Sequence, residues 1–205
     1  MIGRFVTLEG GEGVGKSTQV RALAAALRER GLELVETREP GGSPGAEAIR
    51  RLLLDGTDDR WGAEAEALLF AAARADHVDK VIRPSLQSGS WVLSDRFVDS
   101  SLAYQGGAGR LGLEAVRSIN GFGIGECFPD RTLVLVLPEG IERALARDDH
   151  RSDRIGGRSA DYHRAVDAAF RKIAADEPDR VRLIDASGAV KQVTARLLGA
   201  LEDLL

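Results

Sequence analysis

The sequence predicts an α/β fold in which helices flank a five-stranded parallel sheet on both faces, giving a three-layer sandwich. Two observations carry this prediction. Five short apolar stretches rich in β-branched residues alternate with longer stretches of helical periodicity. The apolar stretches are nearly continuous rather than strictly alternating, which is typical of parallel strands buried on both faces. No linker divides the 205 residues, so we expect one domain spanning 1–205.

The expected strands and helices follow one another along the chain. The strands cover 4–9, 32–37, 91–95, 132–137 and 181–185. The helices cover 17–30, 64–82, 100–103, 113–121, 141–147, 159–175 and 191–204. We expect the helix over 64–82 to end before Pro84, because the residue before a proline disfavours helical geometry. Ligands bind parallel sheets at the carboxyl ends of the strands, so the functional residues are expected there.

Composition argues against several classes of protein. A net charge of −4 argues against non-specific nucleic-acid binding. The single cysteine, Cys127, excludes an internal disulfide framework and a multi-cysteine zinc site. We find neither a signal peptide nor an apolar run near the roughly 20 residues that span a bilayer, and expect a cytoplasmic protein without a membrane partner. The chain has 24 arginines and 4 lysines. Either this excess is a compositional bias, or some of the arginines form a binding site for anions.

The strongest motif follows the first expected strand. The segment 10–17 reads G-x-x-x-x-G-K-S and lies between a strand and a helix, the context of a phosphate-binding loop. Its glycines allow backbone N–H groups to surround a phosphate, Lys16 can reach the β- and γ-phosphates, and Ser17 can ligate Mg²⁺. We therefore expect a nucleoside triphosphate with Mg²⁺ to bind at Gly10, Gly11, Glu12, Gly13, Val14, Gly15, Lys16, Ser17 and Thr18.

The motifs that follow the other expected strands distinguish between types of nucleotide-binding protein. A GTPase would need an N-K-x-D string after a later strand, and the chain contains none. A motor ATPase usually carries four apolar residues followed by an acid, and 91–95 fits this only loosely because Ser94 interrupts it. Arg96 follows Asp95 directly, and an acid beside a base at a strand end suits Mg²⁺ and a second anion together.

A second group of residues has the chemistry to bind an acceptor. Arg38 ends the second expected strand, which we expect beside the phosphate loop. Phe70 and Arg74 are spaced i, i+4 and share a helix face. Phe70 alone is more often a core residue, but a flat ring beside a planar donor fork suits stacking on a base and reading of its edge. The hydroxyls and Tyr104 that follow Arg96 suit a nucleoside pocket, unless the hydroxyls only cap a helix.

Several strings occur along the chain in the order found in one known family. The longest are E-G-G-E-G-V-G-K-S at 9–17, T-R-E-P-G-G at 37–42, L-F-A-A-A-R at 69–74 and S-D-R-F-V-D-S-S-L-A-Y-Q-G at 94–106. Shorter ones are L-L-L-D at 52–55, P-D at 129–130, D-R-I at 153–155 and I-D-A at 184–186. With these strings the chain resembles the bacterial thymidylate kinases (dTMP kinases), which have a P-loop NTPase fold. The resemblance implies transfer of the γ-phosphate of ATP to dTMP, giving dTDP and ADP for dTTP synthesis.

The resemblance also implies roles for the acceptor residues. Phe70 would stack on thymine, and Arg74 would hydrogen-bond to its edge. Arg38 and Arg96 would hold the acceptor phosphate. Further substrate contacts would come from Ser101 near the base, Tyr104 at the 2′ side of the sugar, Gln105, and Glu12 at either the 3′-hydroxyl or the magnesium shell.

On the donor side, the resemblance implies that Asp95 acts through Mg²⁺ and its waters. Arg143 would flank adenine, opposite the loop at Asp185 and Ala186. The segment at about 147–159 would be a short arginine-rich lid, although its charge pattern by itself is that of a solvated loop. Family members without an arginine in the phosphate loop use lid arginines, which here would be Arg147, Arg151 and Arg154, with Arg158 as a further candidate. Together with Lys16 and Arg96, the first three are the expected catalytic residues.

No general base is needed, because an acceptor phosphate is already largely ionised at neutral pH. His77, His150 and His163 are accordingly interpreted as surface or helix residues. The residues leave open another nucleoside monophosphate kinase or a deoxynucleoside kinase, and also a non-catalytic nucleotide-dependent switch. The family further implies a homodimer, for which the helices at 64–82 and 113–121 offer an apolar face.

Overall fold

The computed structural model describes residues 3–57, 60–138 and 154–205. These residues form a five-stranded parallel sheet in the order β2-β3-β1-β4-β5. The strands are β1 (Phe5–Gly10), β2 (Leu34–Arg38), β3 (Trp91–Asp95), β4 (Arg131–Val136) and β5 (Val181–Asp185). Every strand boundary lies within two residues of its expected position. The predicted parallel sheet is therefore confirmed.

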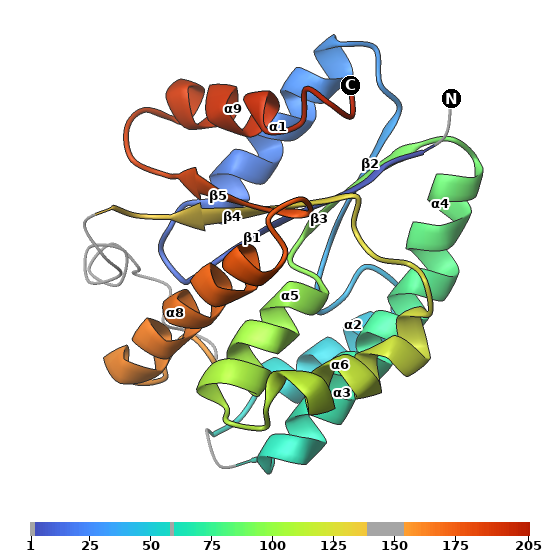
Figure 1. Ribbon diagram of the computed structural model, residues 1–205. Helices are drawn as coiled ribbons and strands as arrows, with labels where there is room; N and C mark the ends of the chain where they lie inside the picture. Colours follow the sequence, from blue (N-terminus) through green and yellow to red (C-terminus); the bar gives the residue numbers. More distant parts are fainter. Residues whose placement is uncertain (1–2, 58–59, 139–153) are drawn as a thin grey trace.

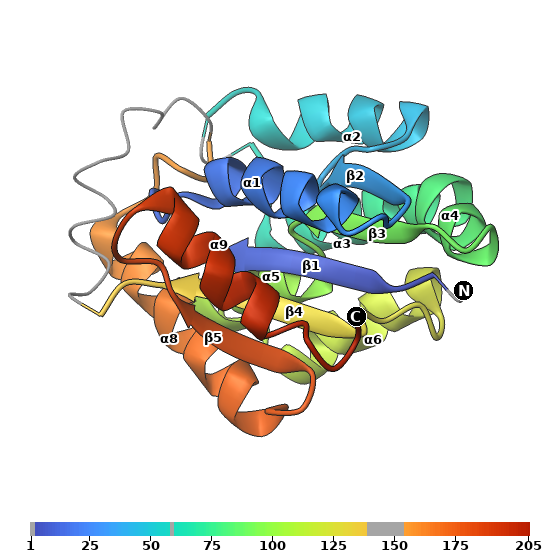
Figure 2. The ribbon, with the colours of Figure 1, turned by 90° about the horizontal axis from the view of Figure 1, so that it is seen from above.

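Helices cover both faces of this sheet (Figure 1). On one face lie α1 (Lys16–Glu29) and α9 (Val190–Gly199), which are seen from above in Figure 2. On the other side lie α2 (Pro44–Leu54), α3 (Ala63–His77), α5 (Val98–Ser101), α6 (Leu113–Ile124) and α8 (Ala160–Asp176). The three-layer sandwich is confirmed. Within the described ranges, no helix is both long and apolar enough to cross a membrane.

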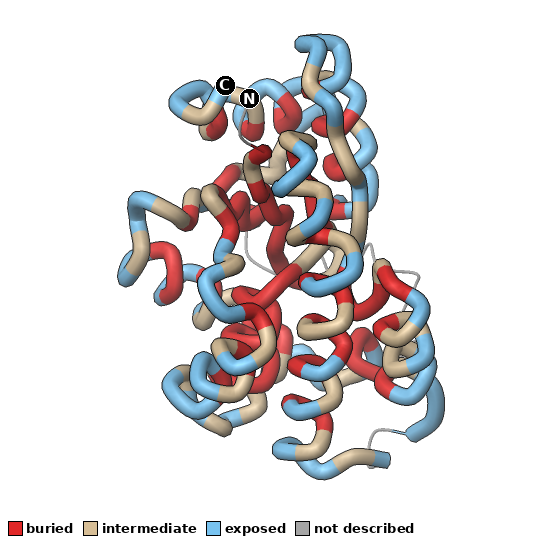
Figure 3. The backbone as a smooth tube through the Cα atoms, turned by 90° about the vertical axis from the view of Figure 1, so that its right-hand side faces the viewer, coloured by how far each residue is buried: buried red, intermediate tan, exposed pale blue. Residues whose placement is uncertain are grey.

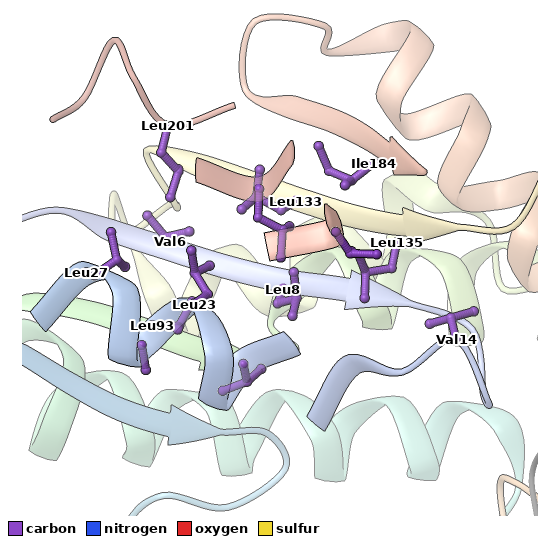
Figure 4. Packing of buried hydrophobic residues seen from close by; sticks show 14 of the residues in the cluster. Val6, Leu8, Val14, Leu23, Leu27, Leu93, Leu133, Leu135, Ile184 and Leu201 are labelled. Carbon is purple, nitrogen blue, oxygen red and sulfur yellow. The ribbon is translucent and has the colours of Figure 1, made fainter. Parts of the chain in front are cut away.

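The core lies on both faces of the central strands. Val6 and Leu8 of β1 and Leu133 of β4 are fully buried against Leu23 and Leu27 of α1 (Figure 4). Burial of one such side chain contributes about 1.5–3 kcal/mol relative to exposure. Buried residues follow the sheet and the inner sides of the helices (Figure 3). This packing holds the carboxyl ends of the strands in fixed positions relative to one another.

The helix expected over 64–82 does not end before Pro84, so this prediction is wrong. After α3 the chain continues through a wider π-helical segment, η1 (Val78–Ile82), into α4 (Arg83–Gln87). The Arg83 N–H bonds to the carbonyl of Val78, five residues back. Pro84 then falls in the first turn of α4, where the missing N–H of proline costs no helical hydrogen bond.

Two further helical segments differ from the expectation. The helix α2 is absent from the expected elements, although Ser43 caps it with its side chain and Pro44 opens its first turn, both typical start signals. The helix expected at 100–103 begins at Val98 and continues as a π-helical segment, η2 (Leu102–Ala108). In η2, a Cβ on Gly107 would lie 2.7 Å from the Ala169 side chain of α8, so a glycine permits this close packing.

Candidate active site

A cavity of about 630 Å³ lies at the carboxyl ends of β1, β2 and β3. Segments that are far apart in the sequence, from the phosphate loop to Gly156, contribute to its wall. The predicted site residues that line it are Glu12, Gly13, Gly15, Lys16, Ser17, Thr18, Arg38, Phe70, Arg74, Asp95, Arg96, Ser101, Tyr104 and Gln105. Lining residues that the sequence analysis did not single out are Glu39, Pro40, Arg50, Leu54, Ser100, Ile155 and Gly156. The structure thus brings the phosphate loop and the acceptor residues together.

The phosphate loop joins β1 to α1. Gly10, Gly13 and Gly15 have φ values of 137°, 71° and 92°, in the region that favours glycine. A Cβ on Gly10 would also lie 2.7 Å from the carbonyl oxygen of Leu135. No side chain caps the start of α1 at Gly15. The first N–H groups of α1 therefore form the kind of helix N-terminus that binds a phosphate.

Lys16 is buried in this loop, and its ammonium group donates to the carbonyl of Gly11. Burial and the nearby Arg96 lower its pKa, and the carboxylates of Glu12 and Asp95 act in the opposite direction. A buried ammonium is costly unless an anion compensates it. Ser17 lies next to it at the exposed start of α1. The two side chains suit a polyphosphate and its metal ion.

Arg96 lines the cavity from a turn directly after β3. Its backbone has a φ of 73°, which is uncommon for a residue with a side chain and costs free energy. The guanidinium donates to the carbonyl of Gly10 at 3.1 Å and to the carboxylate of Glu12 at 2.6 Å. It also lies 5.0 Å from the centre of the Tyr104 ring. Contacts on several sides hold a cation in one orientation.

Glu12 stays ionised because of these partners. Burial raises its pKa, but Arg96, Lys16 and the Tyr104 hydroxyl outweigh burial and bring the pKa to about 2. The Tyr104 hydroxyl donates to Glu12 at 2.9 Å. Tyr104, predicted at the 2′ side of the sugar, and Glu12, predicted at either the 3′-hydroxyl or the magnesium shell, therefore lie side by side in the cavity wall.

Asp95 and Ser17 are the predicted magnesium ligands, and the residues fit the ion. One carboxylate oxygen of Asp95, Oδ1, is buried without a hydrogen-bond partner in the described part of the protein. The residues that the structure describes contain no group of three or more His, Cys, Asp or Glu side chains able to hold a metal. Mg²⁺ does not require such a group, because it often takes one or two protein ligands together with substrate phosphates and water.

Arg74 of α3 is almost wholly buried, at 2% exposure, and hydrogen bonds to protein groups hold its guanidinium in place. Nε donates to Glu39 at 2.7 Å, Nη2 to the carbonyl of Phe97 at 3.0 Å, and Nη1 to Ser101 at 3.0 Å and to Asn120. Since arginine has five N–H donors, these bonds leave one at Nη2 within the described residues. Phe70, one turn earlier on α3, lines the same cavity.

Glu39 and His77 are functional candidates that sequence reasoning missed. Glu39 accepts from Arg74 and also lies 2.9 Å from Nδ1 of His77, whose Nε2 lies 2.7 Å from the Thr37 hydroxyl. His77 is a helix residue as expected, but its interpretation as a surface residue is wrong, because it is fully buried. Its spacing of three residues from Arg74 on one helix face is the signal that could have found it.

His163 of α8 is likewise buried rather than exposed, with Nε2 3.2 Å from the carbonyl of Gly156. The helix-capping alternative for Ser100 and Ser101 does not hold. Ser100 donates to Glu9, and Ser101 accepts from Arg74.

The order of the strands corrects the expectation that the strand ending at Arg38 lies beside the phosphate loop, because β3 separates β2 from β1. Arg38 still lines the cavity, and it pairs with Glu47 at 2.9 Å.

The remaining predicted residues either do not line this cavity or lie outside the described residues. Arg154 is buried in an ion pair with Glu66 of α3, which also accepts from Arg158 and Gln105. Asp185 ends β5, Ala186 follows it, and neither lines the cavity. Arg143, Arg147, Arg151 and His150 lie outside the described residues. The roles assigned to all of these residues stay predictions.

Three comparisons relate the chain to known proteins. A family model described as thymidylate kinase matches residues 8–197. A protein named thymidylate kinase from Rhizorhabdus wittichii is 60% identical, with full coverage of both chains. One from Afipia carboxidovorans is 49% identical, covering 95% of this chain and 87% of its own. A crystal structure of thymidylate kinase from Ehrlichia chaffeensis superimposes with a TM-score of 0.79 at 28% identity, covering 97% and 98% of the two chains.

The family model spans most of the chain, and the two relatives cover it almost completely at high identity. The phosphate loop and the arginine-lined cavity beside it are the features that a kinase of this kind requires. The chain therefore belongs to the thymidylate kinase family, a family of kinase enzymes.

Proposed function

We propose that the protein transfers the γ-phosphoryl group of ATP to dTMP, giving dTDP and ADP. The observation that carries this proposal is the cavity itself, in which a phosphate loop faces two arginines, Arg38 and Arg96, and the pair Phe70 and Arg74. Two phosphate groups have to meet in this reaction, and the basic residues stand where both would lie. The same domain, 1–205, would carry a short lid at about 147–159.

Recognition of the acceptor base rests on the α3 side of the cavity. Phe70 offers a ring face for stacking on thymine, and Arg74 has one N–H left for the base edge. Glu39, Ser101 and Asn120 hold the guanidinium in place before any substrate binds. Pre-ordering of a donor lowers the entropy lost on binding. Gln105 would complete the pocket.

Recognition of the sugar rests on Tyr104 and Glu12. Their hydrogen bond fixes the ring and the carboxylate together. In the proposed pose Tyr104 lies at the 2′ position, where the added hydroxyl of a ribonucleotide would meet the ring. Glu12, ionised through Arg96, would accept a hydrogen bond from the 3′-hydroxyl or from the magnesium shell.

Phosphoryl transfer would proceed by positioning and charge neutralisation. Lys16 and the N-terminus of α1 hold the donor phosphates, and Arg96 with Arg38 holds the acceptor phosphate beside them. Bound Mg²⁺, held by Ser17 and Asp95, would neutralise charge on the donor oxygens. Arg147, Arg151 and Arg154 would add positive charge from the lid, and Arg143 with Asp185 and Ala186 would hold adenine.

An assay of ADP release with four acceptors tests this proposal. We expect fast turnover with dTMP, slower turnover with dUMP, and little with CMP or thymidine. A preference for CMP would favour another nucleoside monophosphate kinase, and a preference for thymidine would favour a deoxynucleoside kinase. No ADP release with any acceptor, from protein that still binds ATP, would favour a nucleotide-dependent switch.

We also propose a homodimer that forms through α3 and α6. Phe122 on α6 is 97% exposed, and Leu68 on α3 is another large apolar side chain left in solvent. The two helices pack against each other, and large apolar side chains exposed on neighbouring elements suggest an interaction site. Phe122→Glu is expected to yield monomers by sedimentation velocity, whereas Val190→Glu, at another exposed apolar site, should leave the dimer intact.

We place the enzyme in the cytoplasm, where its free Cys127 would stay reduced.

A further inference from the structure

Glu9 is a buried carboxyl group to which the proposed mechanism gives no task. It stands near the end of β1, next to the phosphate loop, and is fully buried without lining the cavity. Two donors face it. The N–H of Phe97 lies 2.7 Å from Oε1, and the Ser100 hydroxyl lies 2.6 Å from Oε2. Burial, with the charge of Asp99 added, raises the pKa of Glu9 to about 8. Such a group is costly to bury, so its place calls for an explanation.

The two donors lie in the turn that presents Arg96 and in the helix α5 that follows it. Phe97 directly follows Arg96 in the chain. Ser100 contacts Arg96 itself, because Nη1 of Arg96 donates to the Ser100 hydroxyl oxygen at 3.2 Å. Ser94, on the other side of the turn, donates to the carbonyl of Arg96 at 2.7 Å. The backbone of Arg96 has a positive φ, which persists only when surrounding contacts impose it. Glu9 provides two of those contacts.

The hydrogen bonds have a direction. Ser100 has one hydroxyl hydrogen, and donating it to Glu9 leaves its lone pairs free to accept from Arg96. A guanidinium can only donate. The arrangement Glu9, Ser100, Arg96 is therefore consistent only while Glu9 acts as the acceptor for Ser100.

We propose that Glu9 is a positioning residue for Arg96, because its two carboxyl oxygens fix the Phe97 N–H and the Ser100 hydroxyl and so aim the guanidinium into the cavity. This rests on the proposed function of Arg96 as a ligand of the acceptor phosphate. It adds a residue that touches no substrate. Its loss should weaken binding of the phosphorylated acceptor and leave the donor nucleotide unaffected.

Glu9→Gln tests the proposal without a change of size. The amide has one acceptor oxygen and one NH₂ donor, so it cannot accept from both Phe97 and Ser100. The Ser100 hydrogen is then forced towards Arg96, a donor facing a donor. Thr7→Val is the matched control. Thr7 is buried on the same face of β1, two residues earlier, and its hydroxyl bonds Thr132 at 2.9 Å, away from Arg96.

The measurement is dTMP binding by isothermal titration calorimetry without ATP, beside binding of a non-hydrolysable ATP analogue. It is made near pH 8.5, where the wild-type carboxylate is ionised in the majority of molecules. We expect Glu9→Gln to weaken dTMP binding about tenfold or more and to change analogue binding less than about twofold. We expect Thr7→Val to change neither. Equal losses for both ligands, or the same dTMP loss in Thr7→Val, would overturn the proposal.

Two further variants separate the failure of this inference from failure of the proposed function. Arg96→Lys should weaken dTMP binding, and an unchanged affinity would refute the acceptor-phosphate role itself. A loss with Arg96→Lys but none with Glu9→Gln would refute only the positioning role. Ser100→Ala decides the matter if Glu9→Gln does not fold, since unchanged dTMP binding would break the proposed chain of bonds. In the double variant Glu9→Gln/Ser100→Ala, the loss of dTMP affinity should be smaller than the product of the two single losses, because both changes act on the contact that Arg96 makes with the phosphate.

Discussion

The acceptor and donor halves of the site are built differently. On the acceptor side, Arg74 and Arg96 are held by carboxylates, hydroxyls and carbonyls before any ligand binds. Asp185, which we propose for the donor side, is 41% exposed, and its carboxylate accepts from the nearby Ser187 and lies 3.8 Å from Arg196. The difference indicates that selectivity for the acceptor is preorganised in the fold. In the proposed mechanism, ATP would be bound mainly through the phosphate loop, whose backbone contacts do not depend on the base.

Lys16→Ala should give the largest effect on turnover. Loss of the ammonium removes the side chain that neutralises the transferring phosphates, and we expect kcat to fall by about 10³ or more. Because the acceptor half has its own framework, dTMP affinity measured by calorimetry should change less than about threefold. A parallel loss of dTMP binding would mean that the two halves are not independent.

Arg74→Ala should separate the two substrates. We expect the Kd for dTMP to rise about 100-fold and the Kd for an ATP analogue to stay within about twofold. The melting temperature should fall as well, because Glu39 loses a buried partner. Arg74→Lys is the control, since it retains a charge for Glu39 but not the planar fork. If Arg74→Lys binds dTMP like the wild type, Arg74 does not read the base edge.

Glu9 should make stability depend on pH. Its folded-state pKa of about 8 lies above the ordinary 4.5, so its favourable contribution is complete below pH 4.5 and is lost as the pH rises through 8. Glu9→Gln does not titrate. Relative to wild type, the variant should therefore gain about 2 kcal/mol of stability between pH 6 and 8, measured by urea unfolding without ligands. A constant difference across this range would show that Glu9 does not bind a proton there.

Asp185→Ala should give the smallest effect. The side chain is half exposed and lies outside the cavity, so we expect KM for ATP to rise no more than about threefold and KM for dTMP not to change. Steady-state kinetics with each substrate varied in turn will measure this. A tenfold or larger rise for ATP would show that the donor half is as strictly built as the acceptor half.

Much of the fold could be predicted because its signals are local. Strand burial, the phosphate loop and the i, i+4 pair of Phe70 and Arg74 are patterns within a few residues, and each was found at its expected place. Pro84 misled the prediction, because a rule about one dipeptide cannot show that the π-helical segment before it would accommodate the ring. The start signals of α2 were present at Ser43 and Pro44 but were not used.

The partners of the site residues could not be predicted in the same way. Arg74 and Glu39 are 35 residues apart in the chain, Glu66 and Arg154 are 88 apart, and Glu9 and Ser100 are 91 apart. No periodicity relates such positions. Their meeting depends on the order β2-β3-β1 and on the helices that pack beneath it.

By itself the sequence determined the parallel α/β architecture, the phosphate loop and the identity of most cavity residues, because helix and strand periodicity and loop chemistry are written in neighbouring residues. The tertiary structure alone decided which groups hold them: Glu39 and His77 behind Arg74, and Glu9 and Ser100 behind Arg96. The physical reason is that a buried charge must find its hydrogen-bond partners in space, wherever the packed core brings them.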